Sequence, residues 1–145
     1  RPAGLKVNLC HEAGWLAEGE IGYAGARAEA RARLAADVLR QRLAGLGRLR
    51  VDLIGVASLF NDDNGRWLGA LSAGECRELR LRVALSHADR ACAERVLREV
   101  TALYTCGPAG GGGVRTALRP RLGLRSVTVA RERVPARHVF LEALP

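Results

Sequence analysis

Hydrophobic and polar residues alternate along four segments of the chain, and a period of two is typical of a half-buried β-strand. These segments cover residues 5–9, 49–59, 79–85 and 122–131. The third is the clearest, because single Arg or Ala residues separate Leu79, Leu81, Val83 and Leu85. We therefore expect four strands, each with one buried face and one more polar face.

Two other segments carry apolar residues at the spacing of one helix face. Residues 26–46 are rich in Ala, Leu and Arg, which are strong helix formers. Their predicted apolar face consists of Leu34, Val38, Leu39, Leu43 and Leu46. The second helix is expected after Ser86 and Asp89, a variant of the capping box with Asp in place of Glu, and ends by Gly107-Pro108 because proline stops a helix. Its predicted face consists of Cys92, Val96, Val100 and Leu103, with Ala93 and Leu97 beside them.

The segments between these elements leave alternatives open. Residues 11–25 contain four glycines and either extend the first strand as an irregular hairpin or form a long loop. Residues 61–65 predict a turn, because Asn and Asp bond their own backbone and Gly tolerates a positive φ. One short helical turn is expected within residues 66–76, and residues 114–118 form either a short helix or an irregular segment. The tail from Val134 contains two prolines and is expected to pack loosely.

The expected order of elements is strand, helix, strand, strand, helix, strand. This order is that of the ferredoxin-like split βαββαβ fold, an α+β arrangement in which a four-stranded antiparallel sheet carries two helices on one face. Two right-handed crossovers would place both helices on the same side of the sheet. The alternative is an α/β unit from a larger domain.

Length and composition narrow the class of protein. The 145 residues predict a single α+β domain over residues 1–145. Aromatic residues make up 4%, so the core must be aliphatic. No apolar run approaches the roughly 18 residues of a membrane-spanning helix, and no membrane association is expected. The chain contains no Met and begins at Arg1, which indicates a fragment of a longer protein.

The chain is basic, with a formal charge of +8, and such a surplus is often associated with an anionic partner. Lys6 is the only lysine, the bases are spread along the chain without a block of five, and the arginine excess resembles a compositional bias. We therefore do not expect a nucleic-acid partner. The alternation places five basic residues on the open sheet face, namely Lys6, Arg50, Arg80, Arg82 and Arg125. Without outward aromatic residues for base stacking, this face is expected to be solvated or to dock another domain.

The four cysteines are Cys10, Cys76, Cys92 and Cys106. They form no CxxC pair and show no ligand-like spacing with histidines, so we expect no metal site. We expect free thiols in a reducing cytoplasm, although two disulfides would be compatible with the number of cysteines.

A run of glycines between the second helix and the last strand is the first candidate ligand site. Consecutive glycines let backbone N–H groups approach a phosphate, and a following arginine adds charge. The candidate ligand-binding residues are Gly110, Gly111, Gly112, Gly113 and Arg115. No Gly-Lys-Ser/Thr follows, so the run is not a Walker A loop. The alternative interpretation is a flexible connector.

The second candidate site contains Glu18, Glu20 and Tyr23. Two carboxylates at i and i+2 lie on one face of an extended strand and could bind a cation or share acid/base work. Exposed carboxylates also commonly pair with nearby arginines, which is the alternative here. His11 and His87 have no evident triad partner. No residue pattern identifies a reaction, a catalytic residue or a cofactor, so the sequence alone does not tell whether the chain is an enzyme.

The segment from Gly14 to Gly25, GWLAEGEIGYAG, resembles a Gly-Glu-Ile-Ser-Tyr-Ala-Gly stretch of the AtuA-type acyclic terpene utilisation family. Residues 28–39, 51–56 and 103–115 are similar to later parts of the same proteins. Gly22 stands where the family pattern has Ser, and Cys106 stands where it has Asn. The resemblance covers nearly the whole chain in order. It implies a C-terminal portion of a longer bacterial protein in the breakdown of citronellol- and geraniol-like compounds, which proceeds through acyl-CoA esters.

Two functional hypotheses follow. In the first, the chain helps a catabolic protein bind a CoA-linked or other anionic acyl substrate through the glycine run and Arg115. In the second, it is a non-catalytic docking domain whose basic sheet face packs on the missing N-terminal part or on a second chain. An open concavity at the glycine run would favour a ligand, and an apolar patch on the sheet face would favour docking. The oligomeric state is left open.

Overall fold

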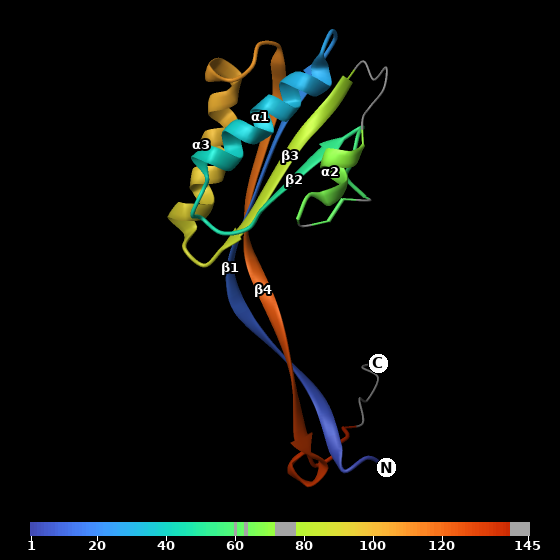
Figure 1. Cartoon of the computed structure of the whole chain (residues 1–145). Coiled ribbons are helices and arrows are strands. Elements are labelled where there is room, and N and C mark those ends of the chain that lie inside the picture. The colour runs from blue at the N-terminus through green and yellow to red at the C-terminus, as the bar shows by residue number, and fades with distance from the viewer. Residues whose placement is uncertain (60, 63, 72–77, 140–145) are drawn as a thin grey trace, which may run out of the picture. The chain divides into compact units, whose positions relative to one another are not determined.

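Four strands, three α-helices and a 3₁₀ turn follow one another in the computed structural model, which describes residues 1–59, 61–62, 64–71 and 78–139 (Figure 1). The strands are β1 (Gly4–Ala24), β2 (Leu49–Ile54), β3 (Glu78–His87) and β4 (Gly111–Ala130). The helices are α1 (Ala28–Arg42), α2 (Arg66–Ala70) and α3 (Arg90–Cys106), and η1 (Arg131–Arg133) is the 3₁₀ turn. The predicted α+β class is therefore confirmed.

The strands form one antiparallel sheet in the order β2-β3-β1-β4. Contacts divide the chain into two compact units, one of residues 13–121 and one of residues 1–12 with 122–145. We call the first the sheet–helix unit and the second the terminal unit, and each is described by itself.

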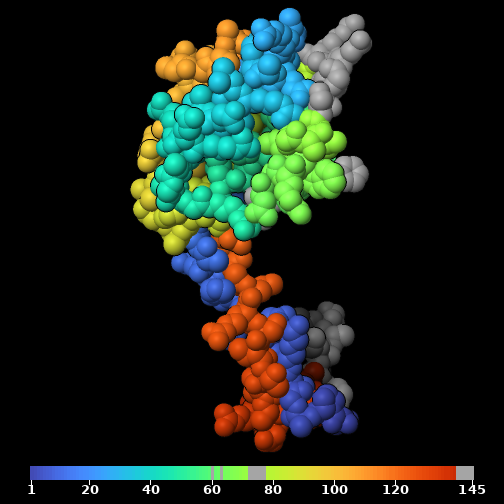
Figure 2. Space-filling model, viewed as in Figure 1, coloured from blue at the N-terminus to red at the C-terminus, as the bar shows by residue number. Residues whose placement is uncertain are grey.

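In the sheet–helix unit, α1 and α3 both pack against β3 and also contact each other. They therefore cover the same face of the sheet, and we call the opposite face the open face (Figure 1). The space-filling view shows α1 and α2 side by side (Figure 2). Arg33 of α1 joins them, because its guanidinium donates to the carbonyl oxygens of Leu68 and Leu71 at 2.6 Å.

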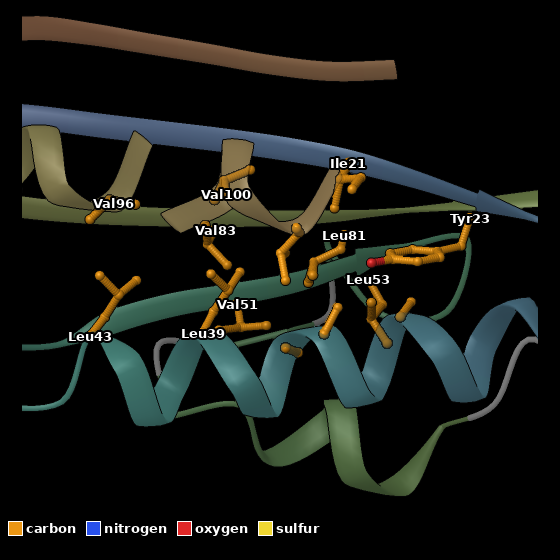
Figure 3. Close-up of a cluster of buried hydrophobic side chains, with 14 of the residues drawn as sticks. Ile21, Tyr23, Leu39, Leu43, Val51, Leu53, Leu81, Val83, Val96 and Val100 are labelled. Atoms are coloured by element: carbon orange, nitrogen blue, oxygen red, sulfur yellow. The ribbon is translucent and has the colours of Figure 1, made fainter. Parts of the chain in front are cut away.

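The core lies between the helices and the sheet, as the alternation in β3 predicts. Figure 3 shows Val83 and Leu81 of β3 among side chains from β1, β2 and α1. Leu79, Leu81, Val83 and Leu85 are each at most 3% exposed. Ile21 lies opposite Leu81 and Val51 lies opposite Val83, and directly opposite residues share a sheet face. Burial of this aliphatic surface is the main stabilising contribution to the fold.

Helix α1 packs largely through the predicted face, since Leu39 and Leu43 are buried and Val38 and Leu46 pack against the core, but Leu34 does not belong to this face. Leu34 is 57% exposed, whereas the alanines at the helix–sheet contact are buried. The buried residues of the helix are Ala28, Ala32, Ala35, Ala36 and Leu39. Small side chains let the helix backbone approach the sheet closely, so the alanines form the packing face together with Leu39 and Leu43.

Three predicted segments differ in the structure. Residues 11–24 do extend the first strand, as one alternative had it, but they continue β1 as a single strand and form neither a hairpin nor a loop. Asp89 is the N-cap of α3, and its side chain accepts from the Ala91 N–H at 3.0 Å, while Ser86 still belongs to β3. Strand β4 begins at Gly111 and includes residues 114–118, which we expected to be helical or irregular.

Other predicted elements are confirmed. Helix α3 ends at Cys106, before Gly107-Pro108. Asp62 forms the expected turn, since its Oδ1 accepts from the N–H groups of Asn64 and Arg66. The short helix is α2. Asp63 of the turn and residues 72–76 of the expected helical segment lie outside the described residues.

The terminal unit contains the first part of β1, the last part of β4 and η1. Ser126 Oγ donates to Asn8 Oδ1 at 2.8 Å, and the Arg131 N–H donates to the Ala3 oxygen at 2.9 Å. Within this unit the two strand segments therefore run antiparallel. Lys6 and Arg125, which we expected on the basic sheet face, belong to this unit and are exposed.

Candidate functional site

Charged side chains from three strands gather on the open face of the sheet–helix unit. The strand register places Arg82 of β3 opposite Glu20 of β1 and opposite Asp52 of β2. Arg82 donates to Glu18 and, at 2.9 Å, to Asp52 Oδ2. Arg50 donates to the same carboxylate at 3.0 Å. The predicted basic face is thus basic at Arg50 and Arg82, but carboxylates are interleaved with the arginines.

Asp52 is the buried member of this network, since it is only 2% exposed. The side-chain amide of Asn61 donates to Asp52 Oδ1 at 3.1 Å and to the Val51 oxygen at 2.8 Å. Burial alone would lower the pKa of Arg82, but its bonds with Glu18 and Asp52 outweigh burial and raise it. The Arg82 guanidinium therefore stays charged and fixed in position.

Arginines also surround a cavity of about 430 Å³ on this face, which we call the arginine cavity. Its charged lining comes from β2, β3, β4 and the residue just before β2. The lining residues are Leu16, Arg48, Arg50, Arg82, Ala84, Ser86 and Arg121. Arg121 Nη1 donates to Ser86 Oγ at 2.6 Å. None of the lining residues is acidic, so the cavity is suited to bind an anion.

The sequence predictions included Arg50 and Arg82 but missed Arg48, Ser86 and Arg121 as site residues. Arg48 precedes β2, and Arg121 was placed just before the last predicted strand. The sequence contains a signal for Arg121. Even numbers of positions separate Arg115, Arg119 and Arg121, as expected of side chains on one strand face.

The candidate carboxylates Glu18 and Glu20 do lie together on the open face. They line a smaller hollow of about 210 Å³ with Arg115, Thr116, Ala117 and Arg119. Both are paired, since Arg119 donates to Glu18 Oε2 at 3.0 Å and Arg80 lies 3.5 Å from Glu20 Oε2. This hollow brings Arg115 of the first predicted site together with the carboxylates of the second.

The structure places Gly111, Gly112 and Gly113 at the start of β4, and Gly110 in the turn just before it. A Cβ on Gly111 would lie 2.8 Å from Ile21 Cδ1 and 3.2 Å from the ring of Tyr23, so close packing requires glycine there. Gly113 has a φ of +61°, a conformation that side chains disfavour. Packing and backbone geometry thus account for glycine at these two positions.

Gly113 and Arg115 line different hollows. Gly113 and Val114 border an open groove of about 800 Å³ whose other wall is α3. Leu97 and Ala102 supply apolar surface to this groove, and Tyr104 on its rim is 63% exposed. A concavity therefore exists beside Gly113, but its lining is mainly apolar, and Arg98 is the only charged residue among the lining residues.

Tyr23 lies away from the candidate carboxylates, in the core beneath the helices (Figure 3). It is 1% exposed, and its hydroxyl has no hydrogen-bond partner among the described residues. Burial raises the pKa of Tyr23, and the nearby Arg31 charge partly offsets this effect. The geometry gives Tyr23 a packing role and does not join it to Glu18 and Glu20.

The remaining candidate side chains form no further site in the described chain. His87 Nδ1 accepts from the Asp89 N–H at 2.9 Å at the start of α3. Cys10, Cys92 and Cys106 are free thiols, and Cys76 lies outside the described residues. Among the described residues, no three His, Cys, Asp or Glu side chains are grouped as metal ligands. None of the described helices has the length and apolar character needed to cross a membrane.

Comparison with known proteins gives one match. A family model described as "Acyclic terpene utilisation family protein AtuA" matches residues 1–140. No curated protein and no solved structure matches the chain.

Proposed function

Because the chain belongs to the acyclic terpene utilisation family AtuA, we propose that it is a binding domain for an anionic acyl compound. The compound would be a CoA-linked or similar intermediate in the breakdown of citronellol- and geraniol-type molecules. The strand order β2-β3-β1-β4, with two long helices on one face, supports a ferredoxin-like fold for this domain.

The arginine cavity is the observation that carries this proposal. Four of its seven lining residues are arginines, and the other three are Leu16, Ala84 and Ser86. A volume of about 430 Å³ falls within the roughly 300–1,000 Å³ typical of small-molecule sites. The cavity combines cationic groups with two apolar side chains, as an anionic compound that carries a carbon chain would require.

Titration calorimetry of the chain with a CoA ester of a branched ten-carbon acid tests the proposal. We expect saturable binding, weakened in Arg48→Gln because that change removes one cationic wall of the cavity. Arg40→Gln is the matched control, since Arg40 lies on α1 and pairs with Asp37. Absence of binding, or equal affinity in both variants, would contradict the proposed function.

A docking role is the second candidate, and one observation in the terminal unit favours it. Leu122 is 72% exposed and Leu124 is 70% exposed, and they lie two residues apart on β4. Exposed apolar side chains that cluster often mark a contact with another chain or domain. The partner would be a second chain or an upstream part of a longer protein.

Analytical ultracentrifugation of the chain tests self-association as one form of docking. If these leucines are buried between copies, the double variant Leu122→Ser/Leu124→Ser should sediment as a monomer at concentrations where the original chain does not. A monomeric original chain would exclude the second copy as partner at those concentrations.

A further inference from the structure

We infer that the arginine cavity is a phosphate-binding site, and that Arg121 exchanges the Ser86 hydroxyl for a phosphate oxygen when the ligand enters. This inference rests on the proposed function, because it names the chemical group that the same cavity recognises. It also identifies Arg121 as a residue that decides specificity, with Ser86 as the group that Arg121 contacts before the ligand enters.

Two of the lining arginines, Arg50 and Arg82, are held in position by carboxylates. Arg82 shares Glu18 and Asp52 with Arg119 and Arg50. Neither carboxylate lines the cavity. These carboxylates therefore hold Arg50 and Arg82 from outside the cavity lining. A phosphate group carries a charge near −2 and several acceptor oxygens, so it can accept from more than one of the lining arginines at once.

A hydrogen bond to an uncharged group holds Arg121 at the cavity. Arg121 Nη1 donates to Ser86 Oγ at 2.6 Å, and a hydroxyl oxygen carries no charge. A phosphate oxygen is a stronger acceptor, because the hydrogen bond is then charge-assisted on both sides. Ser86 would keep a role after this exchange, since its hydroxyl would donate to the phosphate.

The shape of the cavity supports a phosphate bound through its oxygens. Arg50, Arg82 and Arg121 come from three strands of the sheet, so their guanidinium groups reach the cavity from a rigid framework. Arginine donors are planar forks that match the spacing of phosphate oxygens. The lining contains no aromatic residue on which a nucleic-acid base could stack, which favours a small phosphate-bearing molecule.

Calorimetry with inorganic pyrophosphate on the 145-residue chain is the direct test. We expect Arg121→Gln to weaken binding roughly tenfold to a hundredfold, as loss of a charge-assisted contact does. Ser86→Glu should abolish binding, because its carboxylate would occupy the arginines, whereas Ser86→Ala should stay within about threefold of the original chain. Arg40→Gln controls for the general charge of a basic protein. Equal affinities of Arg121→Gln and Arg40→Gln would overturn the inference, and Ser86→Glu gives an independent answer if Arg121→Gln fails to fold.

A second comparison separates this inference from the proposed function. The chain should bind the CoA ester but not the matching pantetheine ester, which has the same acyl group and no phosphate. Equal binding of both esters would overturn the phosphate site and leave the proposed function standing. Binding of pyrophosphate without binding of either ester would sustain the phosphate site and reject the proposed function.

Discussion

Gly19 of β1 lies directly against Val100 of α3. A Cβ on Gly19 would be 2.7 Å from Val100 Cγ2 and 2.9 Å from its Cβ, which is closer than packed carbon atoms approach. Val100 is only 1% exposed and belongs to the helix face that packs on the sheet. The absence of a side chain at Gly19 therefore sets how closely α3 approaches β1.

Gly19→Ala should lower the stability of the fold by about 1–3 kcal/mol, because overpacking forces α3 or its side chains to move. Gly112→Ala is the matched control in the neighbouring strand, since a Cβ there meets nothing within 4 Å. It should change the free energy of unfolding by less than about 1 kcal/mol. Urea denaturation followed by circular dichroism measures both, and equal midpoints would show that the approach of α3 is looser than described.

The alternation of β3 predicts a large difference between two neighbouring substitutions. Leu81 is 1% exposed in the core, so Leu81→Asp should cost about 3 kcal/mol or more by burying an unpaired carboxylate. Arg80→Gln removes an ion pair on the open face that is partly solvated, and such pairs contribute about 1 kcal/mol or less. Chemical denaturation of both variants checks the register of β3. Similar losses would mean that this register is wrong.

Asp89 should make a pH-dependent contribution to stability through the start of α3. The hydrogen bond from the Ala91 N–H, ahead of smaller effects, lowers the pKa of Asp89. A lowered folded-state pKa stabilises the fold above the unfolded value of about 3.9, and this contribution is lost as the pH falls through the folded-state pKa. Asparagine caps a helix equally well but does not titrate in this range.

Thermal unfolding of the original chain and of Asp89→Asn between pH 7 and pH 2 isolates this effect, because other carboxylates titrate in both proteins. The original chain should unfold at the higher temperature at pH 7, and the difference should vanish at the acidic end. A difference that stays constant with pH would show that the charge of Asp89 contributes nothing.

Tyr23→Phe tests whether Tyr23 has a role beyond packing. The hydroxyl is buried without a partner among the described residues, so its removal should leave stability unchanged or raise it by about 1 kcal/mol. Binding of the CoA ester should be unaffected. A marked loss of ligand binding with an unchanged melting temperature would restore Tyr23 as a functional residue.

The sequence predicted which helices and strands form better than it predicted how these elements pack against one another. The strict alternation around Leu81 identifies β3 because side-chain period and burial coincide there. Leu34 was assigned to the core on hydrophobicity, but the alanines pack closer, and this depends on the distance between helix and sheet. Ser86 and Asp89 both fit a helix start, and only the end of β3 at His87 decides between them.

The arginine cavity was only partly predictable, for a related reason. Period-two alternation places Arg50 and Arg82 on one face, but it does not say which residues of different strands lie opposite each other. That depends on register and on strand order. In β4, Gly113 with its positive φ and Pro120 interrupt the pattern, so Arg121 was not recognised as part of a strand.

Nuclear magnetic resonance of the ¹⁵N-labelled chain during titration with the CoA ester tests the central claim most directly. If the ligand binds in the arginine cavity, the largest shifts of backbone amides should occur at Leu16, Ser86 and Arg121. The amides of Gly110 to Gly113 should change little, because the cavity lining does not include them. Shifts concentrated at Gly110 to Gly113, with Ser86 and Arg121 unchanged, would contradict the account.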